Sequence, residues 1–323
     1  MKLSFVVLLG SCLIVCAETE EQINKQFAVR PGGTVIVDVD FGSIQVSTNA
    51  SSQVKVDVYR KVNRRSKSDE EAFLKERPVT FSQEGNTLTI QSKGPSRSFF
   101  NWRGWQRTEA KYTITVPSEF NAQLKTSGGS VGVNDLTGNV KARTSGGSLN
   151  FARLRGPLDG QTSGGSIHAA DCEGEVKIHT SGGRIEVAGG SGTLDGTTSG
   201  GSVSVKNFKG PAHVETSGGG INLENVAGKV DGSTSGGSIS ARFGAPISDE
   251  VRLQTSGGGV TVQVADSSAF DLDAGTSGGR VSSELPVTVV GDISKTRIKG
   301  TVNGGGKPVF LRTSGGSIHV KKL

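Results

Sequence analysis

Side chains that could carry out acid–base, nucleophilic or metal chemistry are few in this chain and stand apart from one another. The 323-residue sequence holds only four histidines, with no metal-ligand spacing. They are His168, His179, His213 and His319. Asp135, Asp171 and Glu186 fall at different positions of a repeating pattern, so they form no pair of facing carboxylates. We therefore expect no enzyme, no catalytic residue, no metal site and no cofactor; a polysaccharide-cleaving enzyme is the disfavoured alternative.

Recognition chemistry, in contrast, concentrates in one short segment. Residues 94–107 hold both tryptophans of the chain, two phenylalanines and three arginines. Tryptophan and arginine are enriched at binding hot spots, and aromatic faces stack on sugars or settle at membrane surfaces. We predict that a ligand or partner binds through Arg97, Phe99, Phe100, Trp102, Arg103, Trp105 and Arg107. The alternative is that the aromatic side chains fold back and cap the open end of the domain.

The elements that must position these side chains are set by a repeat. Thr-Ser-Gly-Gly occurs ten times, and most copies lie 18 residues apart. The copies begin at Thr126, Thr144, Thr162, Thr180, Thr198, Thr216, Thr234, Thr255, Thr276 and Thr313. A fixed period in this range is typical of a solenoid, in which each coil buries its apolar face only by stacking on its neighbours.

Within each repeat, apolar residues alternate along two short segments. Counted from the threonine as position zero, positions five and seven are apolar, as in Val131 and Val133. Positions fourteen and sixteen hold apolar or small residues, as in Val140 and Ala142. A period of two is typical of strands with one buried face. We predict an all-β, single-stack parallel β-solenoid with 18-residue coils, right-handed rather than the triangular left-handed helix, whose six-residue apolar period is missing.

Four further positions carry structural predictions. Position ten should point inward, which would bury Cys172. Position twelve is an unbroken glycine column from Gly138 to Gly228, where a backbone angle or a close approach would exclude a β-carbon. The turn threonines and serines should form a structural ladder, with an ice- or ligand-binding face as the alternative. Position fifteen alternates in charge from Lys141 to Asp231, with His213 as one member, and should pin the register of the strands.

The segments on either side of the repeats should close the rod. Residues 18–122 form a predicted β-rich cap that contains a degenerate coil, the aromatic segment and one short helix opened by Ser68. Residues 123–283 form the predicted solenoid, and residues 284–323 form the C-terminal coils. We expect residues 318–320 to be the terminal strand of the stack, protected from edge pairing by the two lysines that follow.

The first 17 residues are predicted to be a signal peptide and not part of the fold. Lys2 precedes an apolar run that is too short to span a bilayer, and Ala17 offers a cleavage site. A lipid anchor on Cys12 or Cys16 is the less favoured alternative. Cleavage leaves Cys172 as the lone cysteine, so no intramolecular disulfide can form.

Charge and hydropathy exclude two classes of partner. The formal net charge is +6, and loss of Lys2 lowers it to +5, which is mild for this length. Basic and aromatic residues do not alternate along the repeats, so we expect no nucleic acid partner. No later stretch is long and apolar enough to cross a bilayer, so we expect a chain that does not span the membrane.

The chain after residue 17 resembles the bacterial "putative adhesin" family known as domain of unknown function 4097. The resemblance rests on the sequence at 37–44, the helical segment at 69–77, the strand at 114–117 and the repeated Thr-Ser-Gly-Gly-Ser-Ile. Residues 278–283 and 301–306 fit the family as well. The resemblance implies a β-solenoid in the cell envelope or outside the cell, and it brings no catalytic motif.

Two functions follow from these observations as hypotheses. The first is a non-enzymatic, adhesin-like binding or scaffold protein of the periplasm, envelope or cell surface, whose partner is an envelope polysaccharide, a surface matrix or a membrane protein. The second, carried by the resemblance alone, is an envelope-stress sensor or modulator that docks a membrane signalling partner. Capture of glycan material or of a membrane protein from envelope extracts would separate the two.

Overall fold

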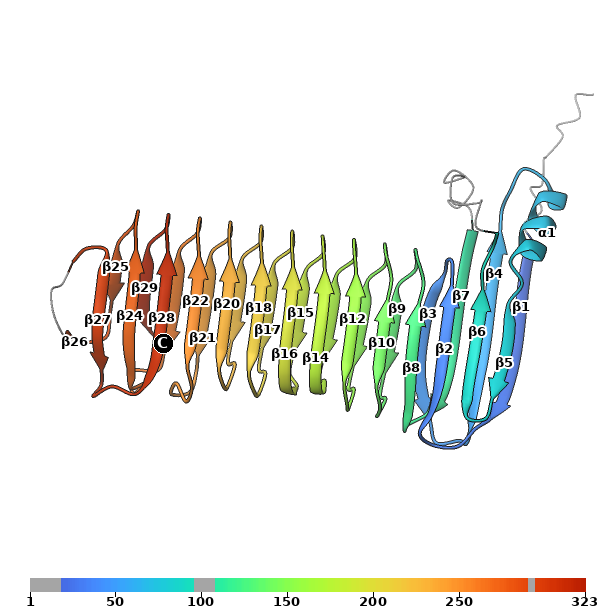
Figure 1. Cartoon of the computed structure of the whole chain (residues 1–323), viewed down its shortest axis with the longest axis horizontal. Helices are drawn as coiled ribbons and strands as arrows, with labels where there is room; N and C mark the ends of the chain where they lie inside the picture. The colour runs from blue at the N-terminus through green and yellow to red at the C-terminus, as the bar shows by residue number, and fades with distance from the viewer. Residues whose placement is uncertain (1–18, 96–107, 290–293) are drawn as a thin grey trace, which may run out of the picture.

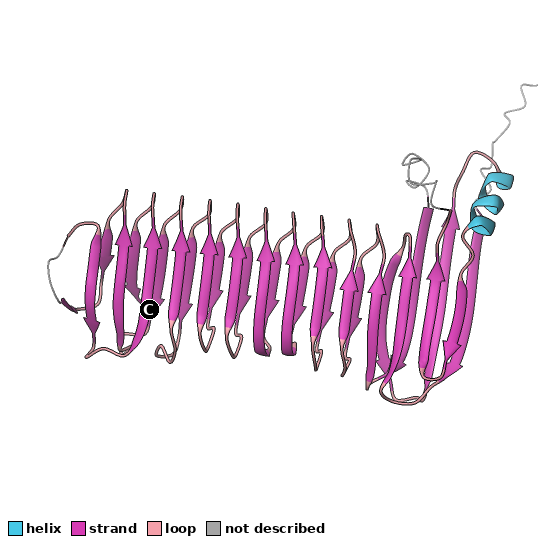
Figure 2. Ribbon diagram, viewed as in Figure 1, coloured by secondary structure: helices cyan, strands magenta, loops and turns pink. Residues whose placement is uncertain are grey.

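The computed structural model describes residues 19–95, 108–289 and 294–323, which build a rod of stacked β-coils (Figure 1). Two sheets run along the rod, and one short helix lies at its N-terminal end (Figure 2). Each regular coil gives one strand to each sheet, and strands of successive coils pair in parallel, as Val140 pairs with Leu158 and Leu149 with Ile167. The fold is the parallel β-solenoid that the repeat predicts.

Among the described residues, sheet A has fourteen strands and sheet B has fifteen. In spatial order sheet A consists of β1 (Thr19–Ala28), β4 (Gln53–Val62), β7 (Thr108–Pro117), β3 (Ser43–Asn49), β9 (Val131–Asn134), β11 (Leu149–Ala152), β13 (Ile167–Ala170), β15 (Ile185–Ala188), β17 (Val203–Lys206), β19 (Ile221–Glu224), β21 (Ile239–Phe243), β23 (Val260–Val264), β29 (Ile318–Lys322) and β25 (Val281–Ser283). Sheet B consists of β26 (Val287–Val289), β27 (Arg297–Val302), β24 (Phe270–Thr276), β28 (Lys307–Thr313), β22 (Val251–Thr255), β20 (Val230–Thr234), β18 (Ala212–Thr216), β16 (Ser191–Thr198), β14 (Glu173–Thr180), β12 (Leu158–Thr162), β10 (Val140–Arg143), β8 (Phe120–Lys125), β2 (Gly33–Val39), β6 (Thr87–Ser92) and β5 (Thr80–Glu84).

The core is a continuous apolar column between the two sheets. Side chains at positions five, seven, fourteen and sixteen point inward, so β10 alternates between buried Val140 and Ala142 and the outward-facing residues beside them. Position ten adds a fifth inward column, which buries Phe208 completely and leaves Cys172 only 3% exposed. The inward orientation predicted for Cys172 is therefore confirmed, and the core has the alternating burial expected of half-buried strands.

The threonine of each turn fastens one coil to the previous one. The hydroxyl of Thr144 donates to the carbonyl oxygen of Gly129 at 2.9 Å and accepts from the amide of Gly147 at 3.3 Å. Thr162 repeats the bond on the next coil by donating to the carbonyl oxygen of Gly147 at 2.8 Å. Because these threonines are buried, their hydroxyls form the structural ladder that the sequence predicts, and the prediction is confirmed for the threonines.

Close contact between coils explains both glycine columns. A β-carbon at Gly147, the second glycine of its turn, would lie 2.0 Å from the carbonyl oxygen of Gly129. Position twelve combines such an approach with a positive φ; at Gly156 φ is +123° and a β-carbon would lie 2.6 Å from the carbonyl oxygen of Gly138. Stacked backbones therefore leave no room for a side chain at either position.

At the N-terminal end, β2 and β3 form the predicted degenerate coil and stack on the first regular coil, β8 and β9. Beyond them lie β6 and β7, and antiparallel β1, β4 and β5 close the end. Helix α1 (Lys67–Glu76) packs over this end. Its cap is Ser66, in an extended conformation, whose hydroxyl accepts from the amide of Asp69 at 3.2 Å. The prediction that Ser68 opens the helix was wrong by two residues, because Ser68 already lies within the first turn.

At the C-terminal end, the coil that comes last in sequence is not last in space. Strands β28 and β29 pair with β22 and β23 on one side and with β24 and β25 on the other (Figure 1). The prediction of a terminal strand at residues 318–320 was therefore wrong. The reason lies in β27, which runs antiparallel to β24; the chain then turns at Gly304 and Gly305 and returns on the opposite side of β24.

Candidate ligand-binding groove

The aromatic segment predicted to bind a partner lies outside the described residues. All seven of its residues, Arg97, Phe99, Phe100, Trp102, Arg103, Trp105 and Arg107, fall between 96 and 107. The strands that flank it are described: β6 ends at Ser92 and β7 begins at Thr108. The segment thus joins β6 to β7 where Thr-Ser-Gly-Gly joins β8 to β9, and its role stays a prediction.

Charged residues at the N-terminal end of the rod hold helix α1 in place. The ring of Phe73 contacts two guanidinium groups, and its centroid lies 4.1 Å from the Cζ atom of Arg64 and 4.4 Å from that of Arg77. Burial, and then the neighbouring charge of Arg77, lower the pKa of Arg64. Arg60 is fully buried and bonds to Glu21. Because these groups are engaged in packing the cap, they form a structural cluster.

The alternating charges at position fifteen lie on neighbouring strands as predicted, but they pair only in part. Lys141 lies 3.9 Å from Asp159, and His213 lies 3.6 Å from Asp231. Lys177, in contrast, bonds to Glu175 of its own strand at 2.6 Å, which raises the pKa of Lys177. The pairs are solvent-exposed and contribute little stability, so this column mainly solubilises sheet B.

A hollow of about 330 Å³ lies on sheet B near the middle of the rod. Asp159, Lys177, His179 and Asp195 line it, and the Nδ1 atom of His179 lies 2.7 Å from the hydroxyl of Thr197. The lining holds groups of both charge signs, and none of its charged or polar side chains is buried. The hollow therefore lacks the desolvated, convergent polar groups typical of a ligand site.

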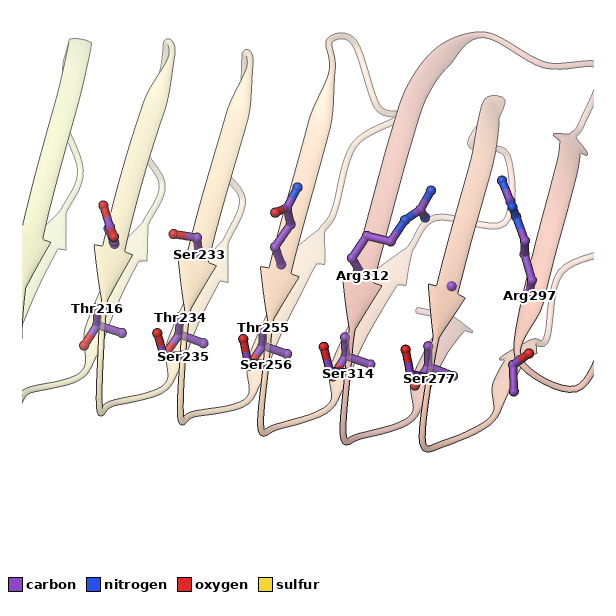
Figure 3. A pocket seen from close by; sticks show the side chains of 16 residues that line it. Thr216, Ser233, Thr234, Ser235, Thr255, Ser256, Ser277, Arg297, Arg312 and Ser314 are labelled. Carbon is purple, nitrogen blue, oxygen red and sulfur yellow. The ribbon is translucent and has the colours of Figure 1, made fainter.

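A groove of about 620 Å³ lies on sheet B, near the C-terminal end of the rod. It crosses the ends of β18, β20, β22, β28, β24 and β27, where the strands meet the turns (Figure 3). Register places one residue of each strand in a row along it. The row is Glu215, Ser233, Gln254, Arg312, Gly275 and Arg297.

Two arginines stand on either side of one strand, β24, at the end of this row (Figure 3). The guanidinium of Arg312 lies 2.9 Å from the carboxylate of Asp273, and it donates to the carbonyl oxygens of Asp273 at 2.6 Å and of Leu311 at 3.0 Å. Arg297 approaches the other carboxylate oxygen of Asp273 at 3.5 Å. Two cations around one carboxylate leave this end of the groove with one net positive charge.

Serine hydroxyls form the opposite wall of the groove. Ser235, Ser256, Ser314 and Ser277 lie in a row along the turns (Figure 3). The hydroxyls of the neighbouring threonines already donate hydrogen bonds to the previous coil, as the hydroxyl of Thr313 does to the carbonyl oxygen of Gly258. In the part of the chain that the structure describes, the four serine hydroxyls have no hydrogen-bond partner, so they are free to bind a ligand.

The groove offers hydrogen bonds and charge but little acid–base chemistry. Glu215 is the single carboxylate among the residues that line it, and histidine and cysteine are not among them. No group of three histidine, cysteine or carboxylate side chains with metal-binding geometry occurs within residues 19–95, 108–289 and 294–323. In the same ranges no helix is long and apolar enough to cross a membrane.

Sequence reasoning missed this groove. Arg297 and Arg312 lie on β27 and β28, which are consecutive in the sequence but have β24 between them in the sheet, and Asp273 lies on β24, in an earlier coil. The only sequence signal is that Arg312 directly precedes a turn threonine, at the position where other coils carry Ser233 or Gln254. That signal does not say which coil lies next to which.

The match to a family model agrees with the fold. The family model described as Toastrack DUF4097 matches residues 36–321. No curated protein matches the chain significantly. A solved "putative lipid binding protein" from Parabacteroides distasonis is 14% identical, with 94% of this chain and 96% of that chain covered and a TM-score of 0.36. A "putative adhesin" from Bacteroides fragilis is 13% identical, with 94% and 97% covered and a TM-score of 0.28. Similarities at this level carry no conclusion about function.

Proposed function

We propose that this chain, which belongs to the Toastrack DUF4097 family, is a non-enzymatic, adhesin-like binding scaffold of the cell envelope or cell surface. The observation that carries the proposal is the groove across β18 to β27. Its lining consists of hydroxyl, amide and guanidinium groups, which bind polar ligands, together with a single carboxylate. Groups of this kind hold a ligand in place without supplying the paired acid and base that hydrolysis needs.

The rigidity of the rod favours binding. The strands that carry the groove, β20, β22, β28 and β24, are hydrogen-bonded to a neighbour on both sides. Threonine bonds lock their turns to one another, for example from Thr255 to the carbonyl oxygen of Gly237 at 2.7 Å. A site built on such a surface loses little conformational entropy when a ligand binds, which supports a scaffold that presents preformed contacts.

Two arguments weigh against an enzyme at this site. Glu215 lies three strands away from Arg312 in the row, so it has no second carboxylate beside it to act as its acid or base partner. Asp273 is held by the two arginines and is mostly buried, which leaves it with the role of orienting them. A polysaccharide-cleaving activity, which requires two facing carboxylates, therefore has no support in the groove.

The proposed location rests on the first 17 residues and on the family. Their apolar run and cleavage site are typical of exported proteins, and they lie outside the described residues. An exported rod with one buried cysteine needs no disulfide, because stacking of coils supplies its stability.

Co-sedimentation tests the proposal. The mature chain is mixed with insoluble envelope polysaccharide prepared from cells, and the bound fraction is measured together with the reducing sugar released. We expect saturable binding with no release of sugar. A Trp102→Ala/Trp105→Ala variant and an Arg297→Gln variant then show whether the aromatic segment or the groove makes the contact. Release of reducing sugar would make the protein an enzyme, and sedimentation at the level of a protein-free control would reject the binding scaffold.

A further inference from the structure

The two arginines of the groove are held in an arrangement that suits an anionic ligand group. A guanidinium has five N–H donors, and three contacts occupy Arg312: the carboxylate of Asp273 and two backbone carbonyls. Two N–H groups of Arg312 therefore remain for a ligand. Arg297 makes one long contact, at 3.5 Å, and its side chain is 58% exposed, so most of its donors are available.

Gly275 opens the space between these arginines. It lies between Arg312 and Arg297 in the row and carries no side chain that would fill the groove. A β-carbon there would lie 3.7 Å from the Nη1 atom of Arg312, in ordinary contact, so the backbone does not demand glycine at this point. The open space therefore lets a ligand group reach both guanidinium groups.

The serine wall adds a second, neutral recognition element. Ser235, Ser256, Ser314 and Ser277 each directly follow the last residue of one of four adjacent strands, whose spacing is about 4.8 Å. That spacing is close to the length of one sugar ring in an extended polysaccharide, so successive rings can meet successive hydroxyls. Serine hydroxyls donate and accept, as sugar hydroxyls do.

The surroundings of the groove disfavour other polymers. The strands that form it have no free backbone edge, so an extended peptide cannot add to the sheet. Its lining contains no aromatic side chain for stacking on bases.

We propose that this groove binds an acidic polysaccharide, with one sugar carboxylate seated over Gly275 between Arg312 and Arg297 and ring hydroxyls bonded to the serine wall. This inference rests on the proposed function and names the ligand class and the contact residues of the same site. The Asp273 carboxylate orients both guanidinium groups, so the site is formed before the ligand arrives.

Calorimetric titration with polyuronate oligosaccharides tests the inference. The mature chain is titrated with the oligosaccharide, with the same oligosaccharide after its carboxylates are reduced to alcohols, and with an oligoglutamate of equal charge. We expect binding of the first, at least tenfold weaker binding of the second because a charge-assisted hydrogen bond is lost, and no measurable binding of the third.

Two variants and one matched control locate the contact. Arg297→Gln removes the exposed guanidinium, and Gly275→Val fills the space between the arginines while suiting a strand. We expect each to weaken binding of the polyuronate at least tenfold, with unchanged circular dichroism and melting temperature. Arg252→Gln serves as the control, because Arg252 lies on β22 outside the groove, paired with Glu250 and stacked 5.0 Å from the ring of Phe310. Binding by Arg252→Gln should stay within twofold of the parent chain.

The outcomes separate this inference from the proposed function. Wild-type affinity in both Arg297→Gln and Gly275→Val would overturn the site, and equal binding of oligoglutamate would overturn the polysaccharide class. If the chain sediments with envelope polysaccharide but ignores the polyuronate, the inference fails and the proposed function stands. If it binds no polysaccharide at all, both fail.

Discussion

Alanine substitution at the two glycines of one turn tests whether the approach of neighbouring coils fixes the repeat. A β-carbon at Gly147 would lie 2.0 Å from the carbonyl oxygen of Gly129, whereas one at Gly146 would lie 3.8 Å from its nearest atom. Ordinary contact begins at 3.4 Å, so Gly147→Ala forces the two backbones apart by more than 1 Å, and Gly146→Ala fits without any shift. The two positions are adjacent and neither has a positive φ, which makes them a matched pair.

The expected loss for Gly147→Ala follows from the contacts that the shift disturbs. Overpacking in a tight core costs about 1–3 kcal/mol. Gly147 also donates to Thr144 at 3.3 Å and accepts from Thr162 at 2.8 Å, and weakening each bond adds about 1 kcal/mol. We expect the free energy of unfolding to fall by about 3–5 kcal/mol in total. Gly146→Ala should change it by less than about 1 kcal/mol, in the stabilising direction, because alanine restricts the unfolded chain.

Urea unfolding followed by circular dichroism measures both variants, and hydrogen exchange at the altered coil measures local opening. The second probe is needed because each coil contacts only its neighbours and a solenoid can open locally. We expect hydrogen exchange around residue 147 to be faster than in the parent chain in Gly147→Ala and unchanged in Gly146→Ala. Equal stability of Gly147→Ala and Gly146→Ala would refute the conclusion that backbone contact requires glycine in this column.

Further predictions concern the core, the threonine ladder and the order of the coils. Burial raises the pKa of the Cys172 thiol to about 11, so thiol labelling should be slow in the folded chain and fast in denaturant. The stability of the parent chain relative to Cys172→Val should be complete below pH 9 and should decline as the pH rises towards 11. Rapid labelling of the native protein would contradict the burial of Cys172. Thr180→Val removes a 2.8 Å hydrogen bond to the carbonyl oxygen of Gly165 and should lower the free energy of unfolding by about 1–3 kcal/mol. Ser181→Ala at the exposed neighbouring residue should change it by less than about 0.5 kcal/mol. Equal losses in the two variants would show that the threonine hydrogen bond does not stabilise the turn. Leu311 is completely buried on β28, so Leu311→Ala should lower the free energy of unfolding by about 2–5 kcal/mol. The substitution should also speed hydrogen exchange in β24 as well as in β28, because β24 joins the rod through β28. Protected exchange in β24 would contradict the position of the β28 coil between β22 and β24.

The alternating charges at position fifteen show which surface features the repeat predicts and which it does not. Its strand register was predicted correctly, because the 18-residue period fixes which residues lie opposite each other. Its ion pairs were predicted only in part, since long exposed side chains can pair with partners on their own strand or on the next one. Lys177 selects Glu175 over Asp159 for this reason, and only atomic positions show it.

The helix and the aromatic segment show two further limits. The segment around residues 66–76 carries enough local signal to predict a helix, but two serines compete for its cap and backbone geometry selects Ser66. The aromatic segment has a composition that predicts binding, and it lies outside the described residues, so its role rests on the sequence alone.

The structure of the single coil follows from the sequence alone. Strand positions, inward columns and required glycines all follow from an 18-residue period in which each coil touches only its neighbours, so local pattern and tertiary contact carry the same information. The tertiary structure alone decided the groove. The coils of Thr276 and Thr313 carry the same turn and make the same threonine bond, so either could stack next to the coil of Thr255. Because the antiparallel return of β27 places the Thr313 coil there, Arg312 meets Asp273 and Arg297, three residues that no local pattern brings together.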